Sequence, residues 1–454
     1  MNQQLTKSLI TYINLKYYGV DIEKSYWEGG KNIAEKLIKN FGENKKYVII
    51  SGLGGNGADG IATGLFLAKL GAQDVRIYII GRINNIVDST EKIIFNKVNE
   101  EILNNKYSNL YIKQDCYSKD IVKGDIIIEC LVGTGIEEVN HSNKLKKRFQ
   151  DVINRISHFN SLIIAMDLAA PSYTPDKIYS LMYPKDERAE VINLNIPNDI
   201  NIYCGPGEVK YLFIPKKYTH KNKNGKLLYI SSTKENKSLE QIITMARQYE
   251  VFVYIYNFNQ NILNLDILSK EDTKYFYLVK DTELKIILSE VDSIVYGSFD
   301  DENLLNESLL KELLNINKIQ ILNQFVMKFN IKDESKNFVL ILNKNETLKQ
   351  DRNNEFPLKA IAFEKKINLI NISLNITLYN YLGDFKISTS SISLKEKYSQ
   401  LLANLIAILS TKNDLWLAMK ASTFILELAN QVDGNYNNIA NHITEAIDWC
   451  REFS

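Results

Sequence analysis

Cysteine, histidine and proline are scarce in this chain of 454 residues, which has four, four and seven of them. No two cysteines form a C-x-x-C pair, so we expect reduced thiols in a cytoplasmic protein and no metal site built on cysteine. The histidines lie in polar or linker segments without ligand spacing, which favours surface positions over catalytic ones. The cysteines are Cys116, Cys130, Cys204 and Cys450.

Long apolar runs are missing as well. No run approaches the ~18 residues that a helix needs to span a bilayer, and the N-terminal segment lacks the features of a signal peptide. A formal net charge of +1 offers no electrostatic basis for binding a membrane or nucleic acid. Hydrophobic content of 45% and charged content of 24% are typical of a globular protein. The length predicts about two or three domains.

The most informative stretch is residues 47–70. Four apolar or β-branched residues, 47–50, predict a buried parallel strand. A turn with five glycines between residues 52 and 60 follows, and residues 61–70 have the apolar pattern of a helix. Glycines allow close backbone approach and a helix N-terminus offers free N–H groups, so this order predicts a phosphate-binding turn. Gly52, Gly54 and Gly57 also have the spacing G-x-G-x-x-G.

The rest of the first half alternates between strands and helices. We expect a helical segment at 5–41, strands at 75–80, 110–113, 125–130 and 162–168, and helices at 90–103 and 144–156, which together predict a parallel α/β sheet. Dinucleotide-binding folds place an acidic residue at the end of the second strand, for the ribose hydroxyls. Here that strand ends in Gly81 and Arg82, which disfavours an NAD dehydrogenase. Arg82 would at most face a 2′-phosphate, and a solvated arginine is the simpler interpretation.

Polar residues follow three of these strands. Asn56 and Asp59 follow the first, Glu129 lies at the end of the strand at 125–130, and Asp167 lies at the end of the strand at 162–168. In open parallel sheets, ligands bind beyond the carboxyl ends of the strands. A single acid there is usually a cap or turn residue. Three strand ends with polar residues, beside glycine turns at 52–60 and 133–135, instead predict a binding site.

Three segments resemble motifs of one family. GLGGNGADG at 52–60, ECLVGTGI at 129–136 and MDLAAP at 166–171 are similar, in order, to loops in the N-terminal domain of the NAD(P)H-hydrate epimerases, which are often fused to an ADP- or ATP-dependent NAD(P)H-hydrate dehydratase. The resemblance implies a Rossmann-like three-layer α/β/α sandwich at residues 1–217. It further implies a ribokinase-like α/β domain at residues 218–454.

The resemblance also implies roles for individual residues. The first loop would hold the pyrophosphate and ribose of hydrated NADH or NADPH, and the second would form the opposite wall. Asp167 would lie beside the nicotinamide ring and act as acid and base while the R and S epimers interconvert. A potassium ion would bind Asn56 and Glu129, where the family has aspartate at the latter position, and the protein would be a homodimer. The binding residues would be Gly55, Asn56, Gly57, Ala58, Asp59, Gly133, Thr134, Gly135, Ile136 and Asp167.

Some positions depart from the family pattern. Gly55 replaces the first asparagine of the loop, Ala170 replaces a serine used at the ion, and Asn198 matches a lysine usual after the later strand. The nucleotide-binding loop therefore matches better than the ion site. We expect an isomerase, the NAD(P)H-hydrate epimerase. The alternative is a catalytically inactive nucleotide-binding or scaffold protein of the same fold.

The second half alternates again, with strands expected at 227–231, 251–256, 293–296, 319–322 and 339–342 and helices at 238–249, 304–314, 395–410 and 415–431. Its family motifs are lost. The segment at 231–238 has no glycine, a glycine-rich turn is reduced to Gly297, and Asn323 and Gln400 stand where the family has aspartates. We expect dehydratase activity to be lost, and a small-molecule kinase is the least favoured function.

Overall fold

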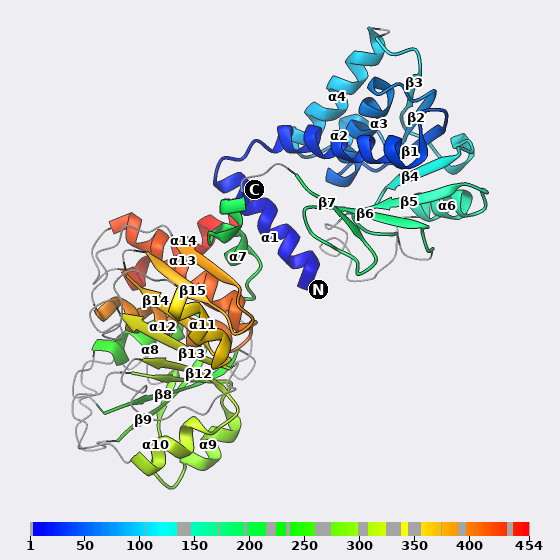
Figure 1. Cartoon of the computed structure of the whole chain (residues 1–454). Coiled ribbons are helices and arrows are strands. Elements are labelled where there is room, and N and C mark those ends of the chain that lie inside the picture. Colours follow the sequence, from blue (N-terminus) through cyan, green and yellow to red (C-terminus); the bar gives the residue numbers. More distant parts are fainter. Residues whose placement is uncertain are drawn as a thin grey trace. The chain divides into compact units, whose positions relative to one another are not determined.

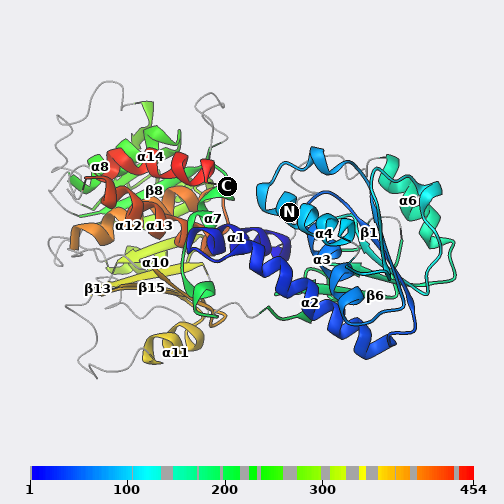
Figure 2. The same cartoon turned by 90° about the horizontal axis from the view of Figure 1, so that it is seen from above.

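The chain forms two compact units, residues 1–200 and residues 201–454. Figures 1 and 2 show their elements in two views. The computed structural model describes residues 3–104, 106–133, 147–170, 173–194, 198–214, 224–232, 237–258, 274–297, 307–323, 337–343, 356–373, 375–388, 396–433 and 439–453.

The first unit is built on a seven-stranded sheet with the order β3-β2-β1-β4-β5-β6-β7, and every neighbouring pair is parallel. Because β1, β4 and β5 are consecutive parallel strands in this order, their carboxyl ends adjoin. The strands are β1 Lys46–Ser51, β2 Asp74–Ile79, β3 Leu110–Lys113, β4 Ile126–Cys130, β5 Leu162–Met166, β6 Lys177–Leu181 and β7 Glu190–Ile192.

Helices cover both faces of this sheet. Tyr47 and Ile49 of β1 belong to a core shared with α2, α3 and α4, whereas Val48 and Ile50 belong to a second core shared with α6. This alternation is what a strand buried on both faces requires. The expected three-layer α/β/α sandwich is therefore confirmed. The helices are α1 Gln3–Tyr17, α2 Ile22–Phe41, α3 Gly55–Lys69, α4 Ser89–Leu103 and α6 Lys147–Ser157, with short 3-10 turns η1 Ile83–Asn85, η2 Ser118–Asp120 and η3 Asn198–Ile202.

The second unit contains a nine-stranded sheet with the order β10-β9-β8-β11-β12-β13-β14-β15-β16. Only the β14–β15 and β15–β16 pairs are antiparallel, so the expected second α/β domain is confirmed. Its strands are β8 Lys226–Ser231, β9 Phe252–Asn257, β10 Phe276–Leu278, β11 Ser293–Tyr296, β12 Ile319–Asn323, β13 Phe338–Asn343, β14 Asn368–Ile372, β15 Ile376–Tyr379 and β16 Phe385–Ser388. Its helices are α7 Pro206–Lys210, α8 Lys237–Gln248, α9 Leu284–Glu290, α10 Glu307–Leu314, α11 Phe356–Glu364, α12 Glu396–Ser410, α13 Leu415–Asp433 and α14 Ile439–Glu452.

The division between the units lies earlier than the boundary expected after residue 217. Residues just beyond 200 already bind β16: the Cys204 N–H donates to the Ile387 carbonyl at 3.0 Å, and Lys386 Nζ donates to the Asn201 carbonyl at 2.7 Å. Helix α7 then packs on α13 and α14. The chain therefore joins the second unit well before residue 217.

The start of α3 differs from the expectation. The helix begins at Gly55, six residues before the expected position 61. Gly57 and Gly60 lie inside the helix, at positions where the neighbouring chain leaves no room for a side chain. A Cβ on Gly57 would lie 2.3 Å from the Gly52 carbonyl oxygen, and one on Gly60 would lie 2.6 Å from Cys130 Sγ. These glycines therefore bring the helix onto the ends of β1 and β4.

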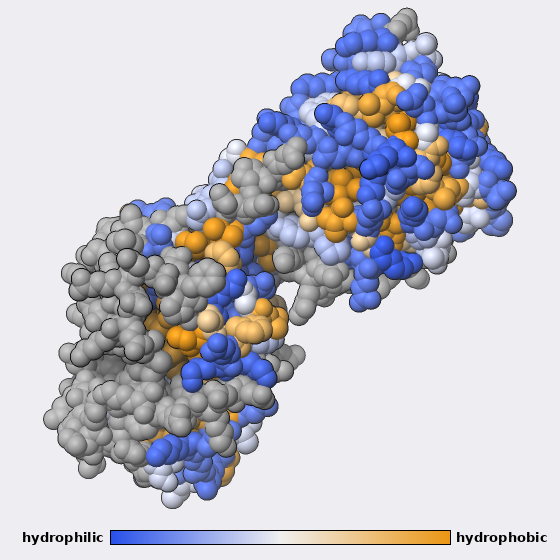
Figure 3. Space-filling view, in the orientation of Figure 1, coloured by the Kyte–Doolittle hydropathy of each residue, from blue (hydrophilic) through white to orange (hydrophobic). Residues whose placement is uncertain are grey.

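The described surface has both hydrophilic and apolar areas. Hydrophilic residues cover most of the visible described face of each unit and are interrupted by apolar areas (Figure 3). Of the helices in the described part of the chain, none combines the length and apolar character that crossing a bilayer demands.

The two glycines at the start of α3 provide a matched test. We expect Gly57→Ala to lower the free energy of unfolding of the first unit by about 2–3 kcal/mol, because the new methyl group meets backbone atoms that cannot rotate away. Gly54→Ala should lower it by no more than about 1 kcal/mol, since a Cβ there has no neighbour within 4 Å and only the preference of the helix N-cap for glycine over alanine is lost. Urea unfolding of both variants measures this. Equal losses would contradict the packing role of Gly57.

Candidate functional site

Asn56 joins the carboxyl ends of two strands. Its side chain is 8% exposed, and Nδ2 donates to the carbonyl oxygens of Val132, beyond β4, at 2.5 Å and of Met166, the last residue of β5, at 3.0 Å. Oδ1 is buried without a hydrogen-bond partner among the described residues. A buried acceptor without a partner is costly, so this oxygen marks a place where a ligand or cation would be stabilising.

Asp167 follows Met166 directly and has a strained backbone. Its φ of 63° lies in the left-handed region, which non-glycine residues occupy at a cost and which is enriched at functional sites. The backbone is held there because the Asp167 N–H donates to the Tyr179 carbonyl of β6 at 2.7 Å. Lys185 Nζ, at 2.5 Å, and the Leu181 N–H, at 3.0 Å, both donate to Oδ1. The carboxylate is therefore fixed in orientation.

A second acid lies near this pair. Lys185 is 5% exposed and Asp59, on α3, is 7% exposed. Burial raises the pKa of Asp59, the charge of Asp167 raises it further, and Lys185 opposes the shift. Two carboxyl groups and one ammonium group therefore share a nearly closed region at the end of β5. Such a cluster can hold and transfer a proton, because protonating one carboxyl group relieves the repulsion between the two.

Glu129 is fully buried at the end of β4 and accepts three hydrogen bonds. The donors are the Leu131 N–H at 2.7 Å, Tyr173 Oη at 2.9 Å and the Ala170 N–H at 3.4 Å. Its pKa is raised to about 7, because burial outweighs the opposing effect of these hydrogen bonds. Glu129 therefore fastens the loop after β5 to the loop after β4, and both of its oxygens are already engaged.

The structure brings together only part of the expected site. Asn56, Asp59 and Asp167 converge, and a Cβ on Gly133 would lie 3.3 Å from Asn56 Cβ. Gly57 and Ala58 are buried in the first turn of α3, whose opening residue, Gly55, is half-buried. Thr134, Gly135 and Ile136 lie outside the described residues.

Lys185 was not predicted from the sequence. This lysine follows β6 and contacts Asp167, whereas Asn198, the residue matched to the family lysine, lies later, in η3. The omission of Lys185 has a physical origin. Strand β6, sequence KIYSL, is short and mixes polar with apolar residues, so it was not recognised as a strand and the lysine after it was not placed at the rim.

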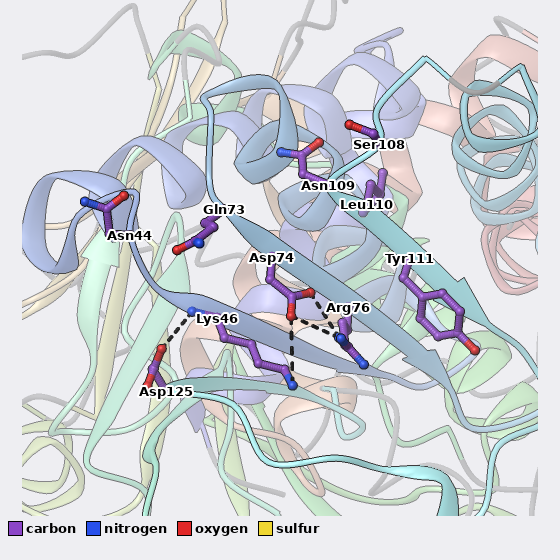
Figure 4. A pocket seen from close by; sticks show the side chains of 10 residues that line it. All are labelled: Asn44, Lys46, Gln73, Asp74, Arg76, Ser108, Asn109, Leu110, Tyr111 and Asp125. Atoms are coloured by element: carbon purple, nitrogen blue, oxygen red, sulfur yellow. Dashed lines mark hydrogen bonds and ion pairs between the residues drawn. The ribbon is translucent and has the colours of Figure 1, made fainter.

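Two cavities of the described part lie elsewhere. One, of about 590 Å³, is lined mostly by polar side chains where β1, β2 and β3 begin, including Lys46 and Asp74 (Figure 4). This is the sheet edge opposite to the site. The other, of about 430 Å³, lies between α2, α3 and α4 and includes Trp27 and Phe66. Neither cavity is lined by an expected site residue. The candidate site is therefore identified from its side chains and their contacts, and not from a cavity.

One family model matches part of the first unit. Residues 28–173 match the sequence model of the family described as YjeF-related protein N-terminus. A bifunctional NAD(P)H-hydrate repair enzyme from Hyperthermus butylicus is 23% identical over 245 residues, which are 49% of this chain and 44% of that protein. An NAD(P)H-hydrate epimerase from Elusimicrobium minutum is 25% identical over 162 residues, which are 34% of this chain and 67% of that protein.

The chain spans about half the length of the bifunctional relatives that it matches. Among solved structures, an ADP/ATP-dependent NAD(P)H-hydrate dehydratase from Bacillus subtilis is similar with a TM-score of 0.42 and 11% identity, over 57% of this chain and all of that one. A likeness this low carries no argument. The family resemblance expected from the three motifs is confirmed for residues 28–173, while the ribokinase-like character of the second unit stays a prediction.

Glu129 predicts a specific pH dependence of stability. Its pKa is raised from an ordinary value of 4.5 to about 7 in the folded protein, so the folded state binds more protons than the unfolded chain between these values. Stability should fall as the pH rises from 4.5 to 7, by on the order of 3 kcal/mol from this group alone. Glu129→Gln should lack this component, whereas Glu100→Gln, at an exposed position, should keep it.

The measurement is urea unfolding at pH 5 and pH 8, followed by Trp27 fluorescence in a protein with Trp416 and Trp449 changed to Phe. The change in the free energy of unfolding between these two pH values is compared in the wild type and in Glu129→Gln, and the difference isolates this carboxyl group. Equal changes in the two proteins would contradict the raised pKa of Glu129.

Proposed function

We propose, from the premise that residues 28–173 form a YjeF-related N-terminal domain, that this chain is an NAD(P)H-hydrate epimerase. The enzyme would be an isomerase that interconverts the R and S epimers of hydrated NADH or NADPH. The observation that carries the proposal is the largely buried pair of Asp167 and Lys185 beside Asn56, at the carboxyl edge where parallel sheets bind their ligands. The relatives named as epimerases and repair enzymes support it.

The chemistry follows from inversion at the hydrated ring carbon. When the C–O bond breaks, the departing hydroxyl needs a proton, and when water adds to the other face it must lose one. The Asp167–Lys185 pair can supply the first proton and take back the second, so the protonation state of the enzyme is restored. Leu181 and Lys185 fix the Asp167 carboxylate, which keeps the reacting oxygen in a constant position.

A potassium ion belongs to the same proposal, with Asn56 and Glu129 as its side-chain ligands. The unpartnered Oδ1 of Asn56 and the nearby backbone carbonyls have the oxygen chemistry that a hard cation needs. Such an ion would supply positive charge beside the dinucleotide phosphates. Glu129 fits less well, because its oxygens already accept three hydrogen bonds and its pKa is raised. A cytoplasmic homodimer is also part of this proposal.

For the second unit we propose that dehydratase activity is lost. Gln400, at the position of the family aspartate, lies on α12 and donates to Asn404 Oδ1 at 3.0 Å instead of presenting a carboxylate. Asn323, the other replaced aspartate, ends β12. Without these acids, phosphate activation lacks its general base and its metal ligand. A phosphoryl-transfer function is least favoured for the same reason.

A second candidate is a nucleotide-binding protein of the same fold without turnover. The observation that favours it is Glu129, whose three internal hydrogen bonds hold the loops after β4 and β5 together without any ligand. It predicts that an adenine dinucleotide raises the melting temperature while no epimerisation occurs.

Both candidates are separated by one assay. We expect purified protein to equilibrate the epimers of hydrated NADH and of hydrated NADPH, and Asp167→Asn and Lys185→Met each to slow this at least about 100-fold, since each removes one member of the proton-transferring pair. Lys177→Met, an exposed position that begins β6, is the control and should keep the wild-type rate. The measurement is chromatographic separation of the epimers over time. A wild-type rate equal to that of buffer alone rejects the epimerase.

A further inference from the structure

An acidic side chain from α4 lies against the first residue of α3. A Cβ built on Gly55 would be 3.3 Å from Glu91 Oε1 and 2.8 Å from Tyr26 Oη. Tyr26 Oη donates to Glu91 Oε1 at 3.4 Å, so the two side chains form one surface beside this residue. Glu91 is half-buried, and the unpartnered Oδ1 of Asn56 belongs to the next residue of the helix. The phosphate-binding turn therefore has a carboxyl group beside it.

This carboxyl group comes from the part of the fold where dinucleotide-binding proteins place their ribose-binding acid. Such proteins use an acidic residue close to the end of the second strand. At the end of β2, a Cβ on Gly81 would lie 2.7 Å from the Leu53 side chain of the turn, so this strand end adjoins the turn. Glu91 lies in the first turn of α4, the helix that follows β2. Residues 81 and 82 lack an acid, and the tertiary structure provides one from the next element.

The charges around Glu91 favour a hydroxyl group over a phosphate group. Asp88 caps α4 next to it, and Lys16 of α1 pairs with Asp88 at 3.3 Å. Burial and then Asp88 raise the pKa of Glu91 to about 7, while Tyr26 and Lys16 oppose this. Above pH 7 the group is an anion and a hydrogen-bond acceptor. Arg82, which would otherwise attract a 2′-phosphate, has its Nε 2.9 Å from Asp115 Oδ2.

We propose that Glu91 is a specificity-determining residue: its carboxylate accepts hydrogen bonds from a ribose beside Gly55 and repels a 2′-phosphate, so the site takes hydrated NADH in preference to hydrated NADPH. This inference rests on the proposed function. The physical basis is that a ribose diol donates two hydrogen bonds to a carboxylate, whereas a second anion at the same place is repelled. Discrimination of this kind comes from the repulsive element as much as from the attractive one.

The test is binding of NAD⁺ and NADP⁺ to the full chain by isothermal titration calorimetry at pH 8, where Glu91 is ionised. We expect the wild type to bind NAD⁺ at least 10-fold more tightly than NADP⁺. In Glu91→Gln, which keeps a hydrogen-bonding group of the same size for Tyr26, the two affinities should lie within about 3-fold because NADP⁺ binding improves. Glu100→Gln, at an exposed position on the same helix, is the matched control and should keep the wild-type preference.

The outcomes separate this inference from the proposed function. Equal affinities in the wild type, or a preference that Glu91→Gln leaves unchanged, overturn the role of Glu91 while leaving the epimerase intact. Loss of both ligands in a Glu91→Gln protein with the wild-type melting temperature also overturns it, because the residue would then serve binding in general. If the wild type binds neither dinucleotide and does not epimerise, the proposed function itself fails.

Discussion

The side-chain amide of Asn56 is the interaction on which the site depends. It donates to the backbone of Val132 and of Met166, so it ties the start of α3 to the ends of both β4 and β5. Helix α3 can approach the ends of β1 and β4 only because Gly57 and Gly60 have no side chain to collide with Gly52 and Cys130. Close packing and one buried amide therefore place the glycine turn after β1 beside the residue that precedes Asp167.

Charge is concentrated at this edge in an unusual way. Asp59, Asp167 and Lys185 are nearly or fully removed from solvent, Glu129 is fully buried, and Glu91 lies against the opening of α3. Burying carboxyl groups costs free energy unless they are protonated or paired, and both remedies are present: Lys185 pairs with Asp167, and burial raises the pKa of Glu129.

The layout of the first half could be predicted because its strands are continuous apolar runs. Residues 47–50 and 126–130 are buried on both faces, and such runs are recognisable without any contact information. Strands β6 and β7 could not be recognised this way, because KIYSL and EVI are short and partly polar. Lys185, which follows β6, was therefore not predicted at the site. Likewise, residues 81 and 82 include no acid, and the carboxyl group beside Gly55 comes from Glu91 on the following helix.

The sequence by itself determined the two α/β domains, the glycine turn after β1 and the meeting of Asn56, Asp59 and Asp167 at one edge. All three follow from local patterns together with the rule that parallel strands share their carboxyl edge. Only the tertiary structure decided which groups pair. Lys185 is 18 positions from Asp167 along the chain, and Glu91 is 65 positions from Tyr26. The state of a buried carboxyl group depends on such distant donors and on burial, which no local spacing records.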